Sequence, residues 1–175
     1  MIRLVDVKFS SRLPQRLCEI YFESFPVEER RDWADLLSRI DDVDSPLNIS
    51  VIEMGDGVAV GFITWWRFEE FVYVEHFAVD ASVRGGGVGS DAIRKFVEQI
   101  DRPVVLEVEL AGANDMADRR IGFYERCGFM SHPDFEYIQP PYAPHLPEVP
   151  LMLMSTAEVA LPSVAASLHR YVYGV

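Results

Sequence analysis

Apolar residues recur along the chain with two periods, which divide it into strands and helices. Alternating or continuous apolar runs predict strands at residues 2–7, 48–54, 58–68, 71–79, 103–110, 135–139 and 149–155. Apolar residues at helical spacing predict helices from residue 10 or 11 to 24, at about 28–40, at 88–100, after Asn114, and at 162–173. The pattern therefore predicts a mixture of strands and helices, without internal repeats.

The order of these elements predicts the architecture. Gly-Asp-Gly at residues 55–57 joins two predicted strands and is a strong hairpin signal. Together with the strand at 71–79 they form an antiparallel meander, after which the helix at 88–100 leads into a parallel strand. We expect one α+β domain over residues 1–175, in which helices flank a central mixed, mostly antiparallel sheet and residues 156–175 form a tail helix. Trp65 and Trp66 are expected on opposite faces of this sheet.

Composition narrows the classes of protein. A hydrophobic content of 49% and a charged content of 25% are typical of a globular domain. The net charge of −12 argues against nucleic-acid binding and suits a cationic partner. Arg3, Asp6 and Lys8 interrupt the start, and no apolar run approaches the length that spans a membrane. Cys18 and Cys127 are the only cysteines, so we expect reduced thiols and a cytoplasmic protein.

A glycine-rich turn, V-R-G-G-G-V-G-S at residues 83–90, lies between a predicted strand and a predicted helix. Glycines lack the Cβ atoms that would block a close ligand, and the first N–H groups of a helix have no partners of their own. The helix dipole favours negative charge at the same place, and Arg84 adds a positive group. The turn is therefore predicted to hold the pyrophosphate of a nucleotide-like cofactor.

Several cofactor classes are compatible with such a turn. A phosphate-binding P-loop is unlike it, because no lysine follows the glycines. Gly87, Gly89 and Ala92 fit the dinucleotide pattern G-x-G-x-x-A, and Glu107 follows on the next predicted strand. Two features argue against a dinucleotide site: the turn is long, and it comes late in the chain. An NAD(P)-linked oxidoreductase and a purely structural loop both stay open as alternatives.

Two segments resemble one known family. The segment at 84–89 resembles the R/Q-x-x-G-x-G/A signature of the GNAT superfamily of acyl-CoA-dependent N-acetyltransferases, and E-H-F-A-V-D at 75–80 is similar to that family's fourth strand. R-R-I-G-F-Y-E-R-C-G-F at 119–129 resembles its Y-E-x-x-G-F segment. The resemblance spans about residues 47–155. It implies transfer of an acetyl group from acetyl-CoA to a primary amine by direct attack in a ternary complex, or a non-catalytic acyl-CoA-binding or sensing module.

The resemblance also implies which residues hold coenzyme A. The strand backbone would pair with the pantetheine arm, and the turn would hold the pyrophosphate. The residues expected to do so are Phe77, Ala78, Val79, Arg84, Gly85, Gly86, Gly87, Val88, Gly89 and Ser90. Many members carry a cofactor-holding asparagine seven residues before the family tyrosine, where this chain has Ala117. Asn114 either replaces that asparagine or caps the following helix.

Acetyl transfer requires a group that takes a proton from the amine and one that gives a proton to the thiolate. Glu75 and His76 are candidates for the base, and strand alternation is expected to send them to opposite faces. The family often has an acidic residue at the position of Glu75, so we expect Glu75 to act directly or through water, with a salt-bridged carboxylate as the alternative. His76 is expected to be packed. Tyr124 matches the family tyrosine and is expected to be the acid, with a core role as the alternative; Cys127 is expected to be a packed thiol.

The acceptor is expected to be a small-molecule or peptide amine, or a protein lysine. Polyamines, aminoglycosides and amino acids all stay open. The connection between the first two helices would wall its pocket through Phe25, Glu28 and Glu29, although both glutamates also suit a helix N-terminus. In the proline-rich stretch at 131–148, Tyr137, Tyr142 and His145 are further candidates, with solvent-exposed packing as the alternative.

No metal is implied, because His132 and His169 have no metal-ligand spacing. The tail helix, with Val164, Leu168 and Tyr171 on one face, is expected to cap the domain or to meet a second subunit. A homodimer is therefore one alternative.

Overall fold

The computed structural model describes all residues from 1 to 175 and contains one eight-stranded sheet. The strand order is β1-β2-β3-β4-β5-β8-β6, and β7 also pairs with β8. Only β4 and β5 are parallel; every other pair is antiparallel. The strands are β1 (Ile2–Val7), β2 (Leu47–Met54), β3 (Ala59–Arg67), β4 (Val72–Val79), β5 (Val104–Glu109), β6 (Met130–Ser131), β7 (Tyr137–Gln139) and β8 (Val149–Ser155). The expected mixed, mostly antiparallel α+β fold is confirmed.

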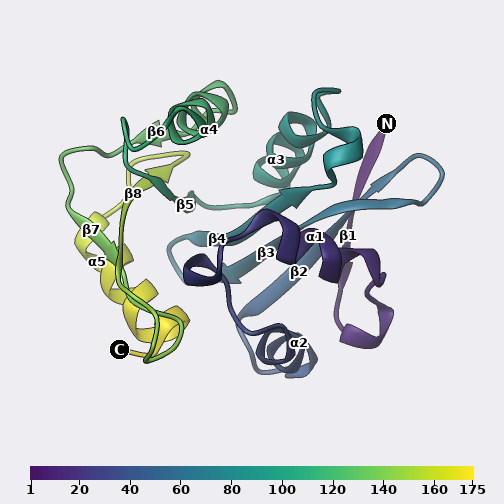
Figure 1. Cartoon of the computed structure of the whole chain (residues 1–175), viewed down its shortest axis with the longest axis horizontal. Coiled ribbons are helices and arrows are strands. Elements are labelled where there is room, and N and C mark those ends of the chain that lie inside the picture. Colours follow the sequence, from purple (N-terminus) through teal and green to yellow (C-terminus); the bar gives the residue numbers. More distant parts are fainter.

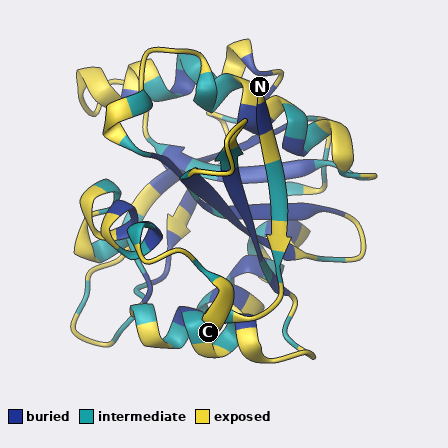
Figure 2. Cartoon of the chain, turned by 90° about the vertical axis from the view of Figure 1, so that its right-hand side faces the viewer, coloured by how far each residue is buried: buried dark blue, intermediate teal, exposed yellow.

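Helices cover both faces of this sheet (Figure 1). They are α1 (Arg16–Ser24), α2 (Trp33–Asp41), α3 (Val88–Gln99), α4 (Asp115–Arg126), α5 (Leu161–Ser167) and the π-helical segment η4 (Leu168–Tyr173). Buried side chains of α3 and α4 belong to one apolar cluster, and those of α1, α2, α5 and η4 belong to a second. The central strands are buried between these two layers, whereas the edge strand β1 is partly exposed (Figure 2). Trp65 and Trp66 lie in different clusters, which confirms their placement on opposite faces.

A β-bulge interrupts β4 at Glu75. Thr64 pairs with His76 and Trp65 pairs with Val74, so Glu75 is an extra residue with no partner on β3. The bulge breaks the alternation of side chains, and Glu75 and His76 both contact Tyr142. The predicted placement of these two residues on opposite faces is therefore wrong, because alternation holds only where the register is uniform.

The parallel strands β4 and β5 pair over only part of their length. Their register joins Val72–Val74 to residues 104–106, although β4 continues to Val79 and β5 continues to Glu109. Beyond this short paired part the two strands separate, as Figure 1 shows. The separation leaves the β5-facing edge of residues 75–79 without a neighbouring strand.

Two helices begin later than the sequence pattern predicts. The first predicted helix is divided into the 3-10 turn η1 (Ser10–Arg12) and α1. The second is divided into the 3-10 turn η2 (Val27–Glu29) and α2, because the side chain of Asp32 accepts hydrogen bonds from the N–H groups of Ala34 and Asp35 at 2.9 and 3.2 Å. Arg31 is thereby kept outside the helix, and its side chain is buried.

The C-terminal segment also departs from the predicted pattern. Tyr171 is 52% exposed, whereas Val172 is buried together with Val164 and Leu168. The wider turn of a π-helix places every fourth or fifth residue on one face, which moves Val172 inward in place of Tyr171. No helix in the structure combines the length and the apolar character that crossing a membrane would need.

Candidate active site

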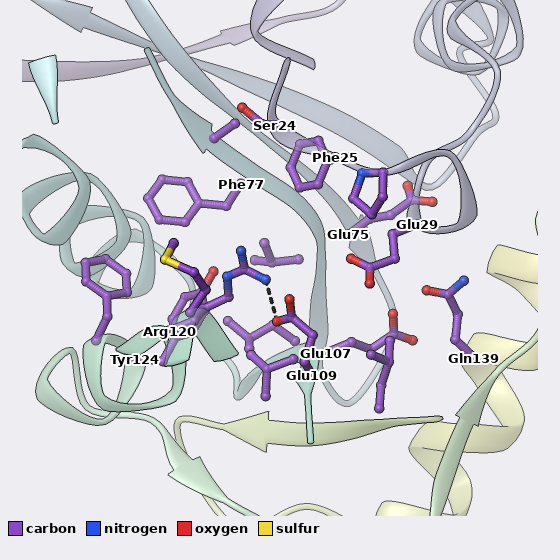
Figure 3. A pocket seen from close by; sticks show the side chains of 18 of the residues that line it. Ser24, Phe25, Glu29, Glu75, Phe77, Glu107, Glu109, Arg120, Tyr124 and Gln139 are labelled. Atoms are coloured by element: carbon purple, nitrogen blue, oxygen red, sulfur yellow. Dashed lines mark hydrogen bonds and ion pairs between the residues drawn. The ribbon is translucent and has the colours of Figure 1, made fainter. Parts of the chain in front are cut away.

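The main cavity, of about 570 Å³, lies where β4 and β5 separate. Both strands line it, and the remaining wall comes from the connection between α1 and α2, from α4 and from the segment that follows β7. Figure 3 shows Phe25, Phe77, Glu107 and Tyr124, which come from four different elements, around the same space. The opening between the strands is therefore the candidate site.

A second cavity, of about 380 Å³, lies at the N-terminus of α3 and shares Arg84 and Phe123 with the first. Three arginines line it: Arg84, Arg94 and Arg126. Gly85 and Gly87 also line it, with φ of +83° and +82°, and the N-cap of α3 is Gly87. Three cations and the free N–H groups of a helix end make this cavity suited to a polyanion.

The Glu75 carboxylate is enclosed and paired. Its Oε1 accepts hydrogen bonds from Arg31 at 2.8 Å and from Tyr142 at 3.0 Å, and its Oε2 accepts one from the indole N–H of Trp66 at 2.8 Å. No part of the Glu75 side chain is exposed. Burial alone would raise the pKa of Glu75, but the charge of Arg31 and these bonds lower it on balance. The group therefore stays ionised and is a weak proton acceptor.

Glu107 lies on the other strand and has a different environment. Its carboxylate accepts hydrogen bonds from the hydroxyls of Tyr73 at 2.8 Å, of Tyr173 at 2.8 and 3.1 Å, and of Tyr137. No arginine or lysine pairs with it. Burial raises the pKa of Glu107 to about 7 against the lowering effect of the three hydroxyls, and the charge of Glu75 adds to the rise.

Three further glutamates line the cavity: Glu23, Glu29 and Glu109. Glu109 is paired with Arg120, as the dashed line in Figure 3 marks. Burial and the charge of Glu109 raise the pKa of Glu29, while the charge of Arg120 lowers it. Glu23, Glu75 and Glu109 each have an arginine partner, so Glu29 and Glu107 are the two carboxylates here without one.

Tyr124 of α4 lines the main cavity and is 8% exposed. Its hydroxyl makes no hydrogen bond within the chain. Burial raises the pKa of Tyr124, against the smaller effect of the Arg120 charge. The phenol is therefore protonated at neutral pH, and its hydroxyl is free to donate to a ligand.

The sequence model described as "Acetyltransferase (GNAT) family" matches residues 14–129 of this chain. The chain belongs to the GNAT acetyltransferase family. It is similar over 100% of its length to a structure described as "Putative acetyltransferase from GNAT family" from Bacteroides thetaiotaomicron, with 35% identity, a TM-score of 0.89 and 99% of that chain covered. Membership of this family, together with the antiparallel meander before the glycine turn, argues against the NAD(P)-linked oxidoreductase that the glycine pattern had left open.

Two other GNAT relatives are more distant. The curated "Putative acetyltransferase YjbC" of Bacillus subtilis (strain 168) is 28% identical over 108 residues, which is 61% of this chain and 53% of that protein. The chain thus aligns with about half the length of this relative. A GNAT acetyltransferase from Elizabethkingia anophelis, solved with acetyl-CoA bound, has 10% identity, a TM-score of 0.60 and coverage of 90% of this chain and 98% of its own, so it shows a shared fold.

Most of the predicted site residues lie around the two cavities. In the main cavity are Phe25, Glu29, Glu75, Phe77, Ala78, Arg84, Tyr124 and Tyr142, and in the second are Val79, Arg84, Gly85, Gly87, Gly89 and Ser90. Cys127 lines the second cavity as well, and burial raises the pKa of its thiol, which is the environment of a packed thiol. The glycine turn and the family tyrosine are therefore brought to one continuous region.

Other predicted site residues lie outside both cavities. Gly86 and Val88 do not line them, and Glu28 contributes only its carbonyl, which accepts from Gln139 at 3.1 Å. Tyr137 lies behind Glu107 and reaches the site only through that carboxylate. The Oδ1 of Asn114 accepts the N–H of Ala117 at 2.9 Å, which makes it the N-cap of α4.

His76 is buried beside Tyr21 and Phe25, at 5.0 and 4.7 Å between ring centroids, and bonds to Thr64 and to the carbonyl of Glu29. It is the packed histidine that was expected.

Sequence reasoning missed Arg31 and Tyr173, which hydrogen-bond to the cavity-lining Glu75 and Glu107, and it considered Glu107 only as part of a dinucleotide pattern. Arg31 lies in a stretch predicted to be helical, and Tyr173 lies 66 residues from the carboxylate that it contacts. Glu107 offered one usable signal, because it is an acidic residue with apolar neighbours on both sides in the strand V-V-L-E-V-E.

Proposed function

We propose that this protein is an acetyl-CoA-dependent N-acetyltransferase that transfers the acetyl group to a primary amine by direct attack in a ternary complex. The observation that supports this most is the arrangement of the two adjoining cavities. One is cationic and lies at a glycine turn, the other is rich in carboxylates, and the unpaired edge of β4 lies beside the main one.

The residues present fit coenzyme A. The pyrophosphate would lie at the N-terminus of α3, with Arg84, Arg94 and Arg126 around it. An added Cβ at Gly85 or Gly87 would meet no atom of the protein within 4 Å, so these positions leave open space for a ligand. The β5-facing backbone of Phe77 and Ala78 has no strand partner and would pair with the amide groups of the pantetheine arm.

The remaining chemistry uses the main cavity. An acceptor ammonium first loses a proton, and the neutral amine attacks the thioester carbonyl carbon. A C–N bond forms, the C–S bond breaks, and the thiolate takes a proton. Tyr124 is proposed as the donor of that proton, because its phenol is protonated and its hydroxyl is unbonded.

Glu75 was expected to be the base, and the structure gives little support for direct proton transfer to it. Its carboxylate is ion-paired with Arg31 and has no exposed surface. We propose instead that Glu75, held by Arg31, positions Tyr142, which lines the cavity.

The test measures release of the coenzyme A thiol from acetyl-CoA with putrescine, lysine, an alanine-terminated peptide and kanamycin as acceptors. We expect Tyr124→Phe to lower kcat at least about tenfold with the most active amine. The thermal shift produced by acetyl-CoA should stay unchanged. Tyr171→Phe is the matched control, because Tyr171 is exposed and lies in η4, far from Tyr124 in the sequence.

A shift with acetyl-CoA but no thiol release with any amine would instead favour a binding or sensing module. Wild-type kcat in Tyr124→Phe would remove the proposed acid.

A further inference from the structure

Three tyrosines from three separate elements converge on Glu107. They are Tyr73 of β4, Tyr137 of β7 and Tyr173 of η4, and the hydroxyl of each donates a hydrogen bond to this one carboxylate. A carboxylate has about four acceptor positions, and the three tyrosines supply three protons. One acceptor position of the carboxylate is therefore left for a further donor. Glu107 lines the main cavity, so a ligand there could supply that donor.

The other carboxylates of the cavity are less suited to taking a proton. Glu23, Glu75 and Glu109 are each ion-paired with an arginine, so their charged forms are stabilised. Glu29 has no arginine partner, but its carboxylate makes no hydrogen bond within the chain that would hold it in one orientation. Glu107 combines a fixed orientation, a strand position and the absence of a cation, which is the combination that proton transfer needs.

We propose that Glu107 takes the proton of the acceptor ammonium and that Tyr173, two residues before Val175, positions its carboxylate. This inference rests on the proposed acetyltransferase function and assigns its base. It also makes the C-terminal segment part of the active site.

The surroundings of Glu107 suit both of its protonation states. Burial brings its pKa to about 7, which is close to the working pH and therefore favourable for a general base. The hydroxyls of Tyr73 and Tyr173 lie 3.3 Å apart. Because a phenol both donates and accepts, these hydroxyls can turn toward each other when Glu107 becomes a carboxylic acid.

The proton balance of the step closes without any further reactant. The ammonium R–NH₃⁺ gives one proton to the Glu107 carboxylate, which leaves R–NH₂ and a carboxylic acid. After the C–N bond forms, the C–S bond breaks and the departing thiolate takes a proton from Tyr124. The second proton of the nitrogen then passes to the Tyr124 phenolate, which restores the phenol. Glu107 then releases its proton to water, so one H⁺ is set free for each acetyl group transferred.

Tyr173 is held in place by contacts that the rest of η4 makes. The carbonyl of the preceding residue, Val172, accepts from Arg31 at 3.0 Å, and Arg31 is the partner of Glu75. The side chain of Val172 is buried. Through these contacts the tail and β4 fix the hydroxyl of Tyr173 at Glu107.

The experiment is a set of pH profiles of kcat/KM with the most active amine of the panel above. Five forms are compared: wild type, Glu107→Gln, Glu29→Gln, Tyr173→Phe and the exposed control Tyr171→Phe. For the wild type we expect kcat/KM to rise with pH through an inflection near pH 7. Glu107→Gln should lose this inflection and fall about 100-fold or more.

The pH profile of Tyr173→Phe distinguishes a positioning role of Tyr173 from a merely structural one. Removal of a donor that stabilises the ionised carboxylate raises the pKa of Glu107, so the inflection should move to higher pH. At high pH the rate should recover to within about tenfold of the wild type, since the base is still present. Tyr171→Phe and Glu29→Gln should keep the wild-type inflection.

An inflection that persists in Glu107→Gln, or one that Tyr173→Phe leaves in place, would overturn this inference while the acetyltransferase function stands. A wild-type protein that acetylates no amine would overturn both. If Glu107→Gln fails to fold, the direction of the Tyr173→Phe shift decides the question.

Discussion

The buried pair of Arg31 and Glu75 offers a direct test of how the site is held together. The two side chains are 6% and 0% exposed, with 2.8 Å between Nη2 and Oε1. In Arg31→Met the aliphatic stem is retained, but Glu75 loses its cation, and Asp35 and the carbonyl of Val172 lose a donor. Leaving a buried charge without its partner costs about 3–5 kcal/mol. For a chain of 175 residues this corresponds to a fall in Tm of roughly 6–20 °C.

The assay is urea unfolding of the wild type, Arg31→Met, Glu75→Gln and the double variant. If the cost comes from the uncompensated charge, the double variant should be more stable than Arg31→Met alone, with a coupling energy of about 2 kcal/mol or more. Arg39→Met is the matched control, because Arg39 also pairs with Asp35 but is 38% exposed, and it should cost less than about 1 kcal/mol. A cost for Arg31→Met no larger than that of the control would refute this account of the pair.

Two further predictions concern the glycine turn and the pH dependence of stability. Gly87→Ala places a side chain at φ +82°, which should cost about 1–2 kcal/mol and weaken acetyl-CoA binding, whereas the added Cβ of Gly89→Ala makes only ordinary contacts at 3.7 Å and should be tolerated. Unfolding midpoints with and without acetyl-CoA check both variants. An equal loss of stability in Gly87→Ala and Gly89→Ala would contradict the geometric argument. The pKa of Glu107 is about 7 when folded and about 4.5 when unfolded, so the folded state binds the proton more tightly. Wild-type stability should therefore fall by up to about 3 kcal/mol from this group as pH rises from about 4.5 to 7, and Glu107→Gln should lack that slope in urea unfolding at several pH values. The same slope in both proteins would mean that the pKa of Glu107 is not raised.

Local patterns in the sequence were enough to predict most of the scaffold. Apolar alternation predicted seven of the eight strands to within a few residues, because these strands carry buried apolar residues. It missed β6, whose two residues are not buried. The glycine turn was also predictable, since a strand, a flexible turn and a helix start follow one another directly in the chain. The same holds for Tyr124, whose segment resembles that of the family.

The catalytic environment depends on contacts that no local pattern contains. The bulge at Glu75 arises from the pairing of β4 with β3, and it alone brings Glu75 and His76 to one side of the sheet. Glu107 meets Tyr73, Tyr137 and Tyr173 at separations of 34, 30 and 66 residues along the chain. Burial and hydrogen bonding decide the pKa of a carboxylate, and both are properties of packed neighbours. The sequence by itself therefore determined most of the elements, their order and the glycine turn, while only the tertiary structure decided which acidic residues of the main cavity are ion-paired and which are not.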